Sequence, residues 1–166
     1  MVVGIDSVNN IYVLDIDRFK TDGKPSEYFK HILDMQQRWG FRKIRAEINS
    51  GQKAIVESLK ESYIRPQGVA LSIDEKMQNR HEGTKEERLA SVLEPRYENL
   101  MVWHYRGGNC QMLEDELAMT NPPHDDIKDA LAAAIDIAKA PSRRGQNKME
   151  RKNNVIYHSR FGGVVA

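Results

Sequence analysis

Phe41-Arg42-Lys43-Ile44-Arg45-Ala46-Glu47-Ile48 is a predicted β-strand between two segments with helical patterning. Before it, we expect Ser26 to cap a helix that runs through Arg38 and ends at Gly40. After it, we expect Ser50 to start a second helix. A strand with a helix on either side is typical of an α/β sheet covered by helices.

The pattern continues outward in both directions. Residues 1–5 and 11–16 are short apolar runs around a polar turn, which predicts a β-hairpin. Downstream, the expected strands are 69–73 and 100–105, and the expected helices run from Thr84 to Leu93, from Cys110 to Met119, and from Asp125 or Asp126 to Lys139. Residues 74–83 are expected to be a loop, and Pro95 to end its helix. The sequence therefore predicts an α/β fold with a mixed β-sheet flanked by helices.

Five aromatic residues are spread over these elements, and we interpret them as core residues instead of a base-stacking platform. They are Tyr12, Phe29, Trp39, Tyr63 and Trp103.

Composition limits the class of protein. The 166 residues are 40% hydrophobic and 30% charged, which is typical of a globular chain. No run approaches 18 apolar residues, so we expect no transmembrane helix and no membrane partner. The single cysteine, Cys110, excludes an internal disulfide framework and fits a cytoplasmic location.

The charge is unevenly distributed, although the net charge is only +1. Residues 141–166 hold six Lys and Arg against one acid, a charge of +5, whereas the other 140 residues hold 19 basic and 23 acidic residues, a charge of −4. We therefore divide the chain into a domain at 1–140 and a basic C-terminal tail at 141–166. The tail is either a solvated terminus or a contact for a polyanion.

Two acidic features could carry chemistry. Glu47 lies near the carboxyl end of the predicted central strand, where ligand sites of open α/β sheets lie. Asp125 and Asp126 stand at a predicted helix start, and Asp129 shares a helix face with Asp125. Carboxylates that converge from a strand end and a helix start can bind Mg²⁺ or Mn²⁺. The alternative is that Asp125 and Asp126 only cap the helix.

Several catalytic motifs are absent from the sequence. It has no Gly-x-x-x-x-Gly-Lys-Ser/Thr loop, no Cys-x-x-Cys, no His-Glu-x-x-His and no Gly-x-Ser-x-Gly. We therefore do not expect this chain alone to be an ATPase of the phosphate-loop type.

Taken together, several short blocks make the chain resemble the nuclease domain of tailed-phage large terminase subunits. The blocks are Asn9–Asp15, Arg45-Ala46-Glu47 with Gln52, Lys85–Leu89 followed by Leu93-Glu94-Pro95, and Pro123-His124-Asp125-Asp126-Ile127-Lys128-Asp129-Ala130-Leu131. They follow the family's order over about residues 1–140, and the last block is the most specific.

The resemblance implies a ribonuclease H-like fold and a Mg²⁺- or Mn²⁺-dependent endonuclease that cuts concatemeric DNA during packaging. It implies that Glu47 and Asp125 are metal ligands, with Asp126 beside them and Asp129 as a further ligand or a supporting residue. Two ions about 4 Å apart would then hydrolyse the phosphodiester. The resemblance also implies that Lys85 lies near the site, where it could hold the scissile phosphate. From the charge of the tail, we expect Arg143, Arg144 and Lys148 to bind the DNA backbone.

The resemblance also implies partners: double-stranded DNA, a terminase ATPase domain, the portal and the small terminase subunit. The location it implies is the cytoplasm of the host cell.

The chain departs from the family pattern in two ways. The ATPase half is absent, so we expect no DNA translocation. The family's leading catalytic aspartate stands on a strand that would precede Met1, and Asp6 is a candidate replacement. A missing first strand would expose an edge of the sheet. The alternatives to a terminase nuclease are a truncated, inactive fragment that binds DNA or a partner, and another ribonuclease H-like nuclease such as a junction resolvase.

Overall fold

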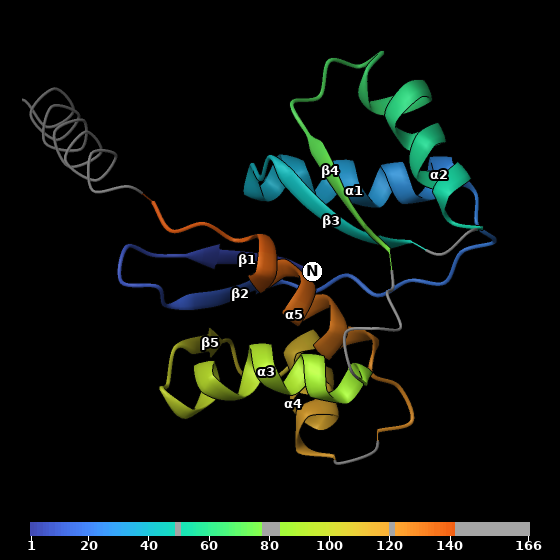
Figure 1. Ribbon diagram of the computed structural model, residues 1–166. Helices are drawn as coiled ribbons and strands as arrows, with labels where there is room; N and C mark the ends of the chain where they lie inside the picture. The colour runs from blue at the N-terminus through green and yellow to red at the C-terminus, as the bar shows by residue number, and fades with distance from the viewer. Residues whose placement is uncertain (49–50, 78–83, 120–121, 142–166) are drawn as a thin grey trace, which may run out of the picture.

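A computed structural model describes residues 1–48, 51–77, 84–119 and 122–141 of the chain (Figure 1). The elements in these ranges are β1 (Val2–Ile5), β2 (Ile11–Asp15), α1 (Pro25–Trp39), β3 (Lys43–Ile48), α2 (Lys53–Ser58), a π-helical continuation of α2 (Leu59–Ile64), β4 (Ser72–Met77), α3 (Lys85–Glu98), β5 (Val102–His104), α4 (Asn109–Ala118) and α5 (Asp126–Ile137). The alternation of strands and helices confirms the predicted α/β class.

The strands form two separate sheets. In the first, β1 is antiparallel to β2, and β2 is parallel to β5. In the second, β3 and β4 are parallel and in register from the Lys43–Ser72 pair to the Ile48–Met77 pair. Helix α5 packs against both β1 and β3, so it joins the two sheets (Figure 1).

Two apolar clusters hold these layers together. The larger combines residues of β2, α3, α4 and α5, and Cys110, Leu113 and Leu131 in it are completely buried. The smaller lies between α1 and the π-helical segment and contains Phe29, Leu59 and Ile64. Helix α5 contributes four buried residues to the larger cluster, so its position relative to α3 and α4 is fixed by packing.

The first helix begins two residues earlier than predicted. Pro25 takes the first helical position, where its missing N–H costs no hydrogen bond, and Lys24 is the N-cap residue, so Ser26 is not the cap. The predicted end is confirmed: Gly40 adopts the left-handed conformation with φ of 66°, and its N–H donates to the Gln36 carbonyl. The predicted start of the next helix at Ser50 lies outside the described residues.

The fourth strand begins and ends later in the sequence than predicted. Its second half consists mostly of polar residues from the segment 74–83, which was predicted to be a loop. The strand runs over Ser72–Met77 instead of 69–73. Its charged side chains are paired: Asp74 with Arg45 of β3, and Glu75 with Lys60. The residues just before it, Val69 and Leu71, pack against the smaller cluster instead.

Pro95 does not end helix α3, which continues to Glu98. A proline inside a helix costs about 3 kcal/mol, because one hydrogen bond is lost and its ring meets the preceding turn. Buried Leu89 and Leu93 lie before the proline, and Tyr97 packs on the larger cluster after it. Apolar packing on both sides therefore keeps the helix continuous.

Three of the five aromatic residues predicted to be core are exposed. Tyr12 is 38% exposed, Trp39 42% and Trp103 54%, which corrects that interpretation. Tyr12 and Trp103 are register partners on neighbouring strands, on the sheet face opposite to buried Ile11 and Val13. Phe29 and Tyr63 do pack in the smaller cluster.

None of the helices in the described ranges is both long and apolar enough to cross a membrane.

Candidate functional site

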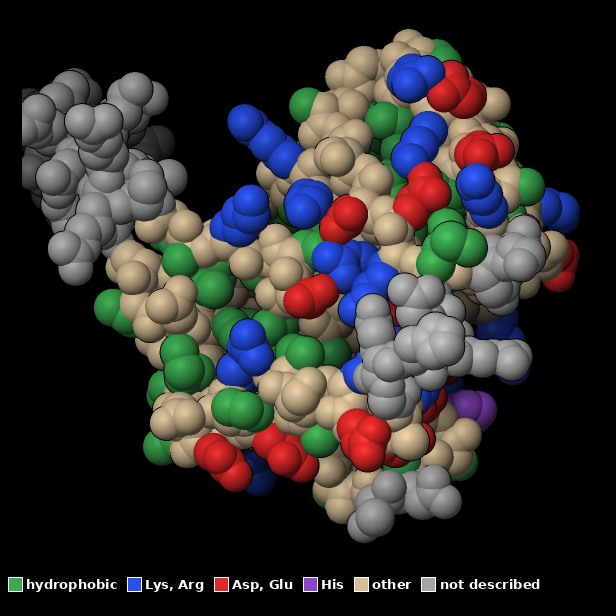
Figure 2. All heavy atoms as spheres, viewed as in Figure 1, with side chains coloured by type: hydrophobic (Ala, Val, Ile, Leu, Met, Phe, Trp, Pro, Cys, Tyr) green, Lys and Arg blue, Asp and Glu red, His purple; other side chains and the backbone are tan. Residues whose placement is uncertain are grey.

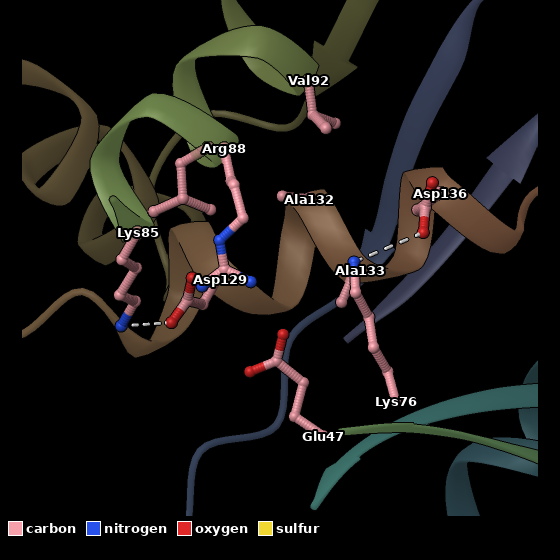
Figure 3. A pocket seen from close by; sticks show the side chains of 10 residues that line it. Glu47, Lys76, Lys85, Arg88, Val92, Asp129, Ala132, Ala133 and Asp136 are labelled. Carbon is pink, nitrogen blue, oxygen red and sulfur yellow. Dashed lines mark ion pairs between the residues drawn. The ribbon is translucent and has the colours of Figure 1, made fainter. Parts of the chain in front are cut away.

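Glu47 reaches the site from the end of β3, as the sequence predicted. Alternation along the strand places Glu47 on the same face as Arg45, whose guanidinium contacts helix α5. Ile48, on the opposite face, is buried and anchors the end of the strand. The Glu47 side chain is thus held at the carboxyl end of β3 and turned toward α5 (Figure 3).

Helix α5 brings Asp125 and Asp129 to the same place through one lysine. The Lys85 ammonium, at the start of α3, lies 2.7 Å from an Asp125 carboxylate oxygen and also forms an ion pair with Asp129. The lysine side chain is one-third exposed, and that of Asp129 is 20% exposed. Lys85 is positioned by the predicted capping box, in which Thr84 and Glu87 exchange hydrogen bonds at the start of α3.

The beginning of α5 is capped by a residue that sequence reasoning missed. The carboxylate of buried Glu116, from α4, accepts hydrogen bonds of 2.9 Å from both the Ile127 and the Lys128 backbone N–H groups. Asp125 is the N-cap residue but makes no capping hydrogen bond with its side chain. Because Glu116 satisfies the helix start, the Asp125 carboxylate is available to Lys85. This geometry is contrary to the alternative in which Asp125 serves only as a cap.

A second anchor ties the far end of α5 to the β3–β4 sheet. The Arg45 guanidinium donates to Asp136 at 2.7 Å and contacts Asp74 of β4 at 2.9 Å. Lys76 lies 3.9 Å from the same Asp136 carboxylate. Asp136 and Asp129 are two helical turns apart on one face of α5, so this network fixes the side of the helix that faces Glu47.

The electrostatics show a crowded group of carboxylates. Burial raises the pKa of Asp129, the neighbouring charges of Glu47 and Asp125 raise it further, and Lys85 only partly offsets them. The hydrogen bond from Lys85 lowers the pKa of Asp125. Partial burial by itself would lower the pKa of Lys85, but its two carboxylate partners outweigh this and hold that pKa well above its ordinary value. Lys85 is therefore a permanent positive charge among acids.

These groups surround a small pocket of about 70 Å³ (Figure 3). Two helices form its walls, each with four side chains on one face. Helix α3 contributes Lys85, Arg88, Leu89 and Val92, and helix α5 contributes Asp129, Ala132, Ala133 and Asp136. On the side of the β3–β4 sheet, the pocket is closed by Glu47 and Lys76. The i, i+3, i+4, i+7 spacing on both helices turns the two sets of helical side chains toward each other. The pocket has room for a hydrated ion or a phosphate oxygen, but not for a nucleoside.

The donor set fits a hard divalent cation, although it is arranged around an ammonium group. Within the described part of the chain, no group of three His, Cys, Asp or Glu residues is already arranged to hold a metal ion. The available donors are carboxylate oxygens, which Mg²⁺ and Mn²⁺ prefer. Lys85 supplies a positive charge between Asp125 and Asp129, so a cation bound to both acids would displace it.

Not all of the predicted site residues come together. Glu47, Asp129 and Lys85 line the pocket, and Asp125 joins them through Lys85. The side chain of Asp126 is 71% exposed and lies 3.5 Å from Arg18, in the segment after β2. The predicted DNA-binding residues Arg143, Arg144 and Lys148 lie outside the described residues.

Asp6, the candidate replacement for a leading aspartate, is a turn residue. Its carboxylate accepts hydrogen bonds from the backbone N–H groups of Val8 and Asn10, from the Asn10 side chain and from the Tyr12 hydroxyl. Desolvation opposes the ionised form, but these hydrogen bonds outweigh it and lower the pKa of Asp6. Asp6 holds the β1–β2 turn together and is not among the residues that line the pocket.

Sequence reasoning also missed Arg45, Asp136 and Glu116, which position the site. One signal was present for Glu116: it is an acid on the helix face that carries apolar Leu113 and Leu117. The pairing of Arg45 with Asp136 spans 91 positions and had no local signal.

A family model described as "Terminase Bacteriophage T7, Ribonuclease H-like domain" matches residues 1–100. The matched residues include Glu47 and Lys85, and the acids of α5 lie beyond them. No curated protein and no solved structure matches the chain.

Proposed function

The chain belongs to the phage terminase ribonuclease H-like family, and on that premise we propose that it is a metal-dependent DNA endonuclease domain that cuts concatemeric genome DNA during packaging. The observation that carries this proposal is the convergence of Glu47 from β3 and Asp125 and Asp129 from α5 around Lys85. All four residues are also site candidates in the sequence.

The proposed metal ligands are Glu47 and Asp125, with Asp129 beside them. Bound Mg²⁺ or Mn²⁺, in a pair of ions, would supply Lewis-acid chemistry at the scissile phosphodiester. Burial raises the pKa of Asp129, and the neighbouring charges of Glu47 and Asp125 raise it further. A divalent cation would relieve this repulsion, and this supports the assignment.

Lys85 has two proposed roles in such a site. In the apo protein, its ammonium holds Asp125 and Asp129 together. With a cation bound to these carboxylates, the lysine would be available to contact a phosphate oxygen of the DNA. Its raised pKa means that it acts as a fixed charge, not as a proton acceptor at neutral pH.

We further propose that Arg143, Arg144 and Lys148 hold the DNA backbone. Contacts of this kind read little sequence, so binding and cutting are expected to be largely nonspecific and sensitive to salt. The proposed partners in assembly are a terminase ATPase domain, the portal and the small terminase subunit, in the cytoplasm of the host cell.

A second candidate function is a ribonuclease H-like domain that binds DNA or a partner but does not cut by itself. The position of Asp6 favours this candidate, because its carboxylate is bound within the β1–β2 turn and does not line the pocket. Neither β1 nor that turn then supplies a further metal ligand beside Glu47. In this case, Mn²⁺ binding would be retained without cleavage.

Titration of the purified chain with Mn²⁺ by calorimetry tests the proposed ligands. Glu47→Gln and Asp125→Asn are each expected to weaken Mn²⁺ binding at least tenfold, because each removes one anionic ligand. Asp115→Asn, on the exposed face of α4, is the matched control and should bind like the unaltered chain. Equal binding by all four proteins would contradict the proposed site.

A further inference from the structure

Arg88 of helix α3 lines the same pocket as the acids Glu47 and Asp129. It follows Lys85 by three residues, so both cations lie on the face of α3 that packs against α5. Leu89, the next residue, fixes this orientation because its buried side chain belongs to the larger apolar cluster. The pocket therefore receives a second cation, besides Lys85, from the same helix.

The Arg88 side chain is held against the wall of the pocket. The residue is half-buried, and its Nε atom is shielded from solvent. Ala132 and Ala133, on the facing side of α5, are small and leave room for a long side chain between the two helices. In Figure 3, Arg88 extends from α3 toward Asp129 and Glu47. The guanidinium is thus directed at the place where these two carboxylates converge.

The two α5 acids that line the pocket each have a cation other than Arg88 as a partner. Asp129 forms an ion pair with Lys85, and Asp136 forms one with Arg45 at 2.7 Å. These two bases tie α5 to α3 and to β3, so they account for the position of the helix. Arg88 therefore adds positive charge to the pocket beyond what anchors α5.

The surface around the pocket carries charges of both signs. Figure 2 shows Lys and Arg side chains among Asp and Glu side chains where α5 meets the β3–β4 sheet. Lys76 of β4, which also lines the pocket, lies 3.9 Å from Asp136. Because neighbouring acids offset the bases, such a surface attracts a polyanion only weakly. A phosphate group therefore needs a directed contact with a particular base.

The geometry of arginine suits this contact. A guanidinium donates two parallel N–H bonds to two oxygens of one phosphate, whereas the ammonium of a lysine acts as a point charge. The pocket, at about 70 Å³, has room for a phosphate oxygen but not for a nucleoside. The guanidinium of Arg88 is therefore placed to meet the backbone of a nucleic acid and not its bases.

We propose that Arg88 is a substrate-binding residue that donates to non-bridging oxygens of one DNA phosphate beside Glu47 and Asp129. In this arrangement Arg88 holds the phosphate against the proposed metal site, whereas Lys85 holds the α5 carboxylates in place. The inference rests on the proposed function, because that function brings DNA to this pocket.

Fluorescence anisotropy with a short DNA duplex in Mn²⁺ tests the proposal. Phosphorothioate linkages keep the charge of the backbone and resist cleavage, so binding is measured without turnover. Arg88→Gln should weaken binding at least tenfold. It should also lower the slope of log affinity against log salt by about 1, because one phosphate contact is lost. Arg65→Gln removes the same charge from an exposed pair with Glu61, and this matched control should bind within about twofold of the unaltered chain.

Calorimetry with Mn²⁺ alone distinguishes contact with the phosphate from support of the carboxylates. Arg88→Gln should bind Mn²⁺ at least as tightly as the unaltered chain, because a positive charge beside the cation site is removed. Glu47→Gln should show the opposite effect.

Arg88→Lys keeps the charge but loses the planar fork. It should therefore weaken binding of the duplex while the salt dependence is retained. If Arg88→Gln fails to fold in circular dichroism, this variant still decides the question.

Three results would overturn the proposal. The first is equal binding of the duplex by Arg88→Gln and Arg65→Gln, which would mean that only the net charge matters. The second is loss of Mn²⁺ binding in Arg88→Gln, which would make Arg88 a support for the carboxylates. The third is unaltered binding of the duplex by Arg88→Lys, which is contrary to a bidentate contact.

Failure of the proposed function gives a different result. An unaltered chain that binds no Mn²⁺ would remove the metal site, and the comparison of Arg88→Gln with Arg65→Gln in duplex binding would still decide the role of Arg88. An unaltered chain that binds Mn²⁺ but no duplex would overturn the role of Arg88 and leave the metal site in place.

Discussion

Replacing Glu116 with glutamine should destabilise the fold and disturb the acidic site together. The Glu116 side chain is buried, and one of its carboxylate oxygens accepts hydrogen bonds from both N–H groups at the start of α5. A glutamine at this position keeps a neutral oxygen acceptor, but it loses the negative charge and adds two N–H donors that need partners. The shape of the side chain is nearly unchanged, so the effect reports charge and hydrogen bonding instead of volume.

The size of the effect follows from the two hydrogen bonds and the helix terminus. A hydrogen bond to a charged group contributes about 1.5–3 kcal/mol, and one to a neutral group about 1 kcal/mol. An anion near a helix start contributes about 0.3–1 kcal/mol, and more where it is partly buried. Because these contributions overlap and the buried charge itself is unfavourable, we expect a net loss of about 1.5 kcal/mol. This lowers Tm by about 5 °C in a domain of this size.

Urea unfolding followed by circular dichroism measures this loss. Asp115→Asn, the exposed neighbour of Glu116, is the control and should change the free energy of unfolding by less than about 0.5 kcal/mol. Glu116→Gln should also weaken Mn²⁺ binding, because Asp125 is the N-cap residue and Asp129 lies in the first turn of the helix that Glu116 holds. A Glu116→Gln protein as stable as the unaltered chain would refute the assignment of Glu116 as the cap of α5.

Three further outcomes are expected. Asp126→Asn should leave Mn²⁺ binding within about twofold of the unaltered chain, whereas Asp129→Asn should weaken it at least tenfold, and equal losses in calorimetry would contradict this placement of the two acids. The pKa of Asp129 is raised above 3.8 and that of Asp125 is lowered below it, so on acidification Asp129 takes up its proton first. Mn²⁺ affinity should therefore begin to fall above pH 3.8 in the unaltered chain, and a fall confined to lower pH would count against burial of Asp129. Deletion of residues 141–166 should weaken DNA binding more at low salt than at high salt, and unchanged affinity at low salt, measured by fluorescence anisotropy, would exclude the tail as a DNA contact.

Local patterns in the sequence predicted most of the elements and the composition of the site. The capping box at Thr84 positions Lys85 as expected, and Gly40 ends α1 through its left-handed conformation. Glu47 and Asp129 approach each other because the end of a β-strand and the start of a helix meet at the same edge of the fold. These predictions rest on helix capping and strand alternation, which are local properties.

The predictions that failed depended on contacts between distant residues. Asp74 belongs to β4 because Arg45, distant in sequence, neutralises it, so local polarity wrongly suggested a loop. Asp126 points away from the site because the phase of α5 is set by its buried face and by the Arg45–Asp136 ion pair. An acid on an apolar helix face marks Glu116 as unusual, but its role depends on how α4 packs beside α5, which that local pattern does not encode.

Plasmid cleavage by the purified chain, with Mn²⁺, Mg²⁺ or EDTA, is the most direct test of the proposed nuclease function. The account predicts cutting with either metal ion, no cutting in EDTA, loss of cutting in Glu47→Gln and in Asp129→Asn, and normal cutting in the Asp115→Asn control. Cutting that persists in both site variants would place the chemistry elsewhere in the chain. A folded chain that binds Mn²⁺ but does not cut would contradict an independent nuclease and identify a domain that binds without cleaving.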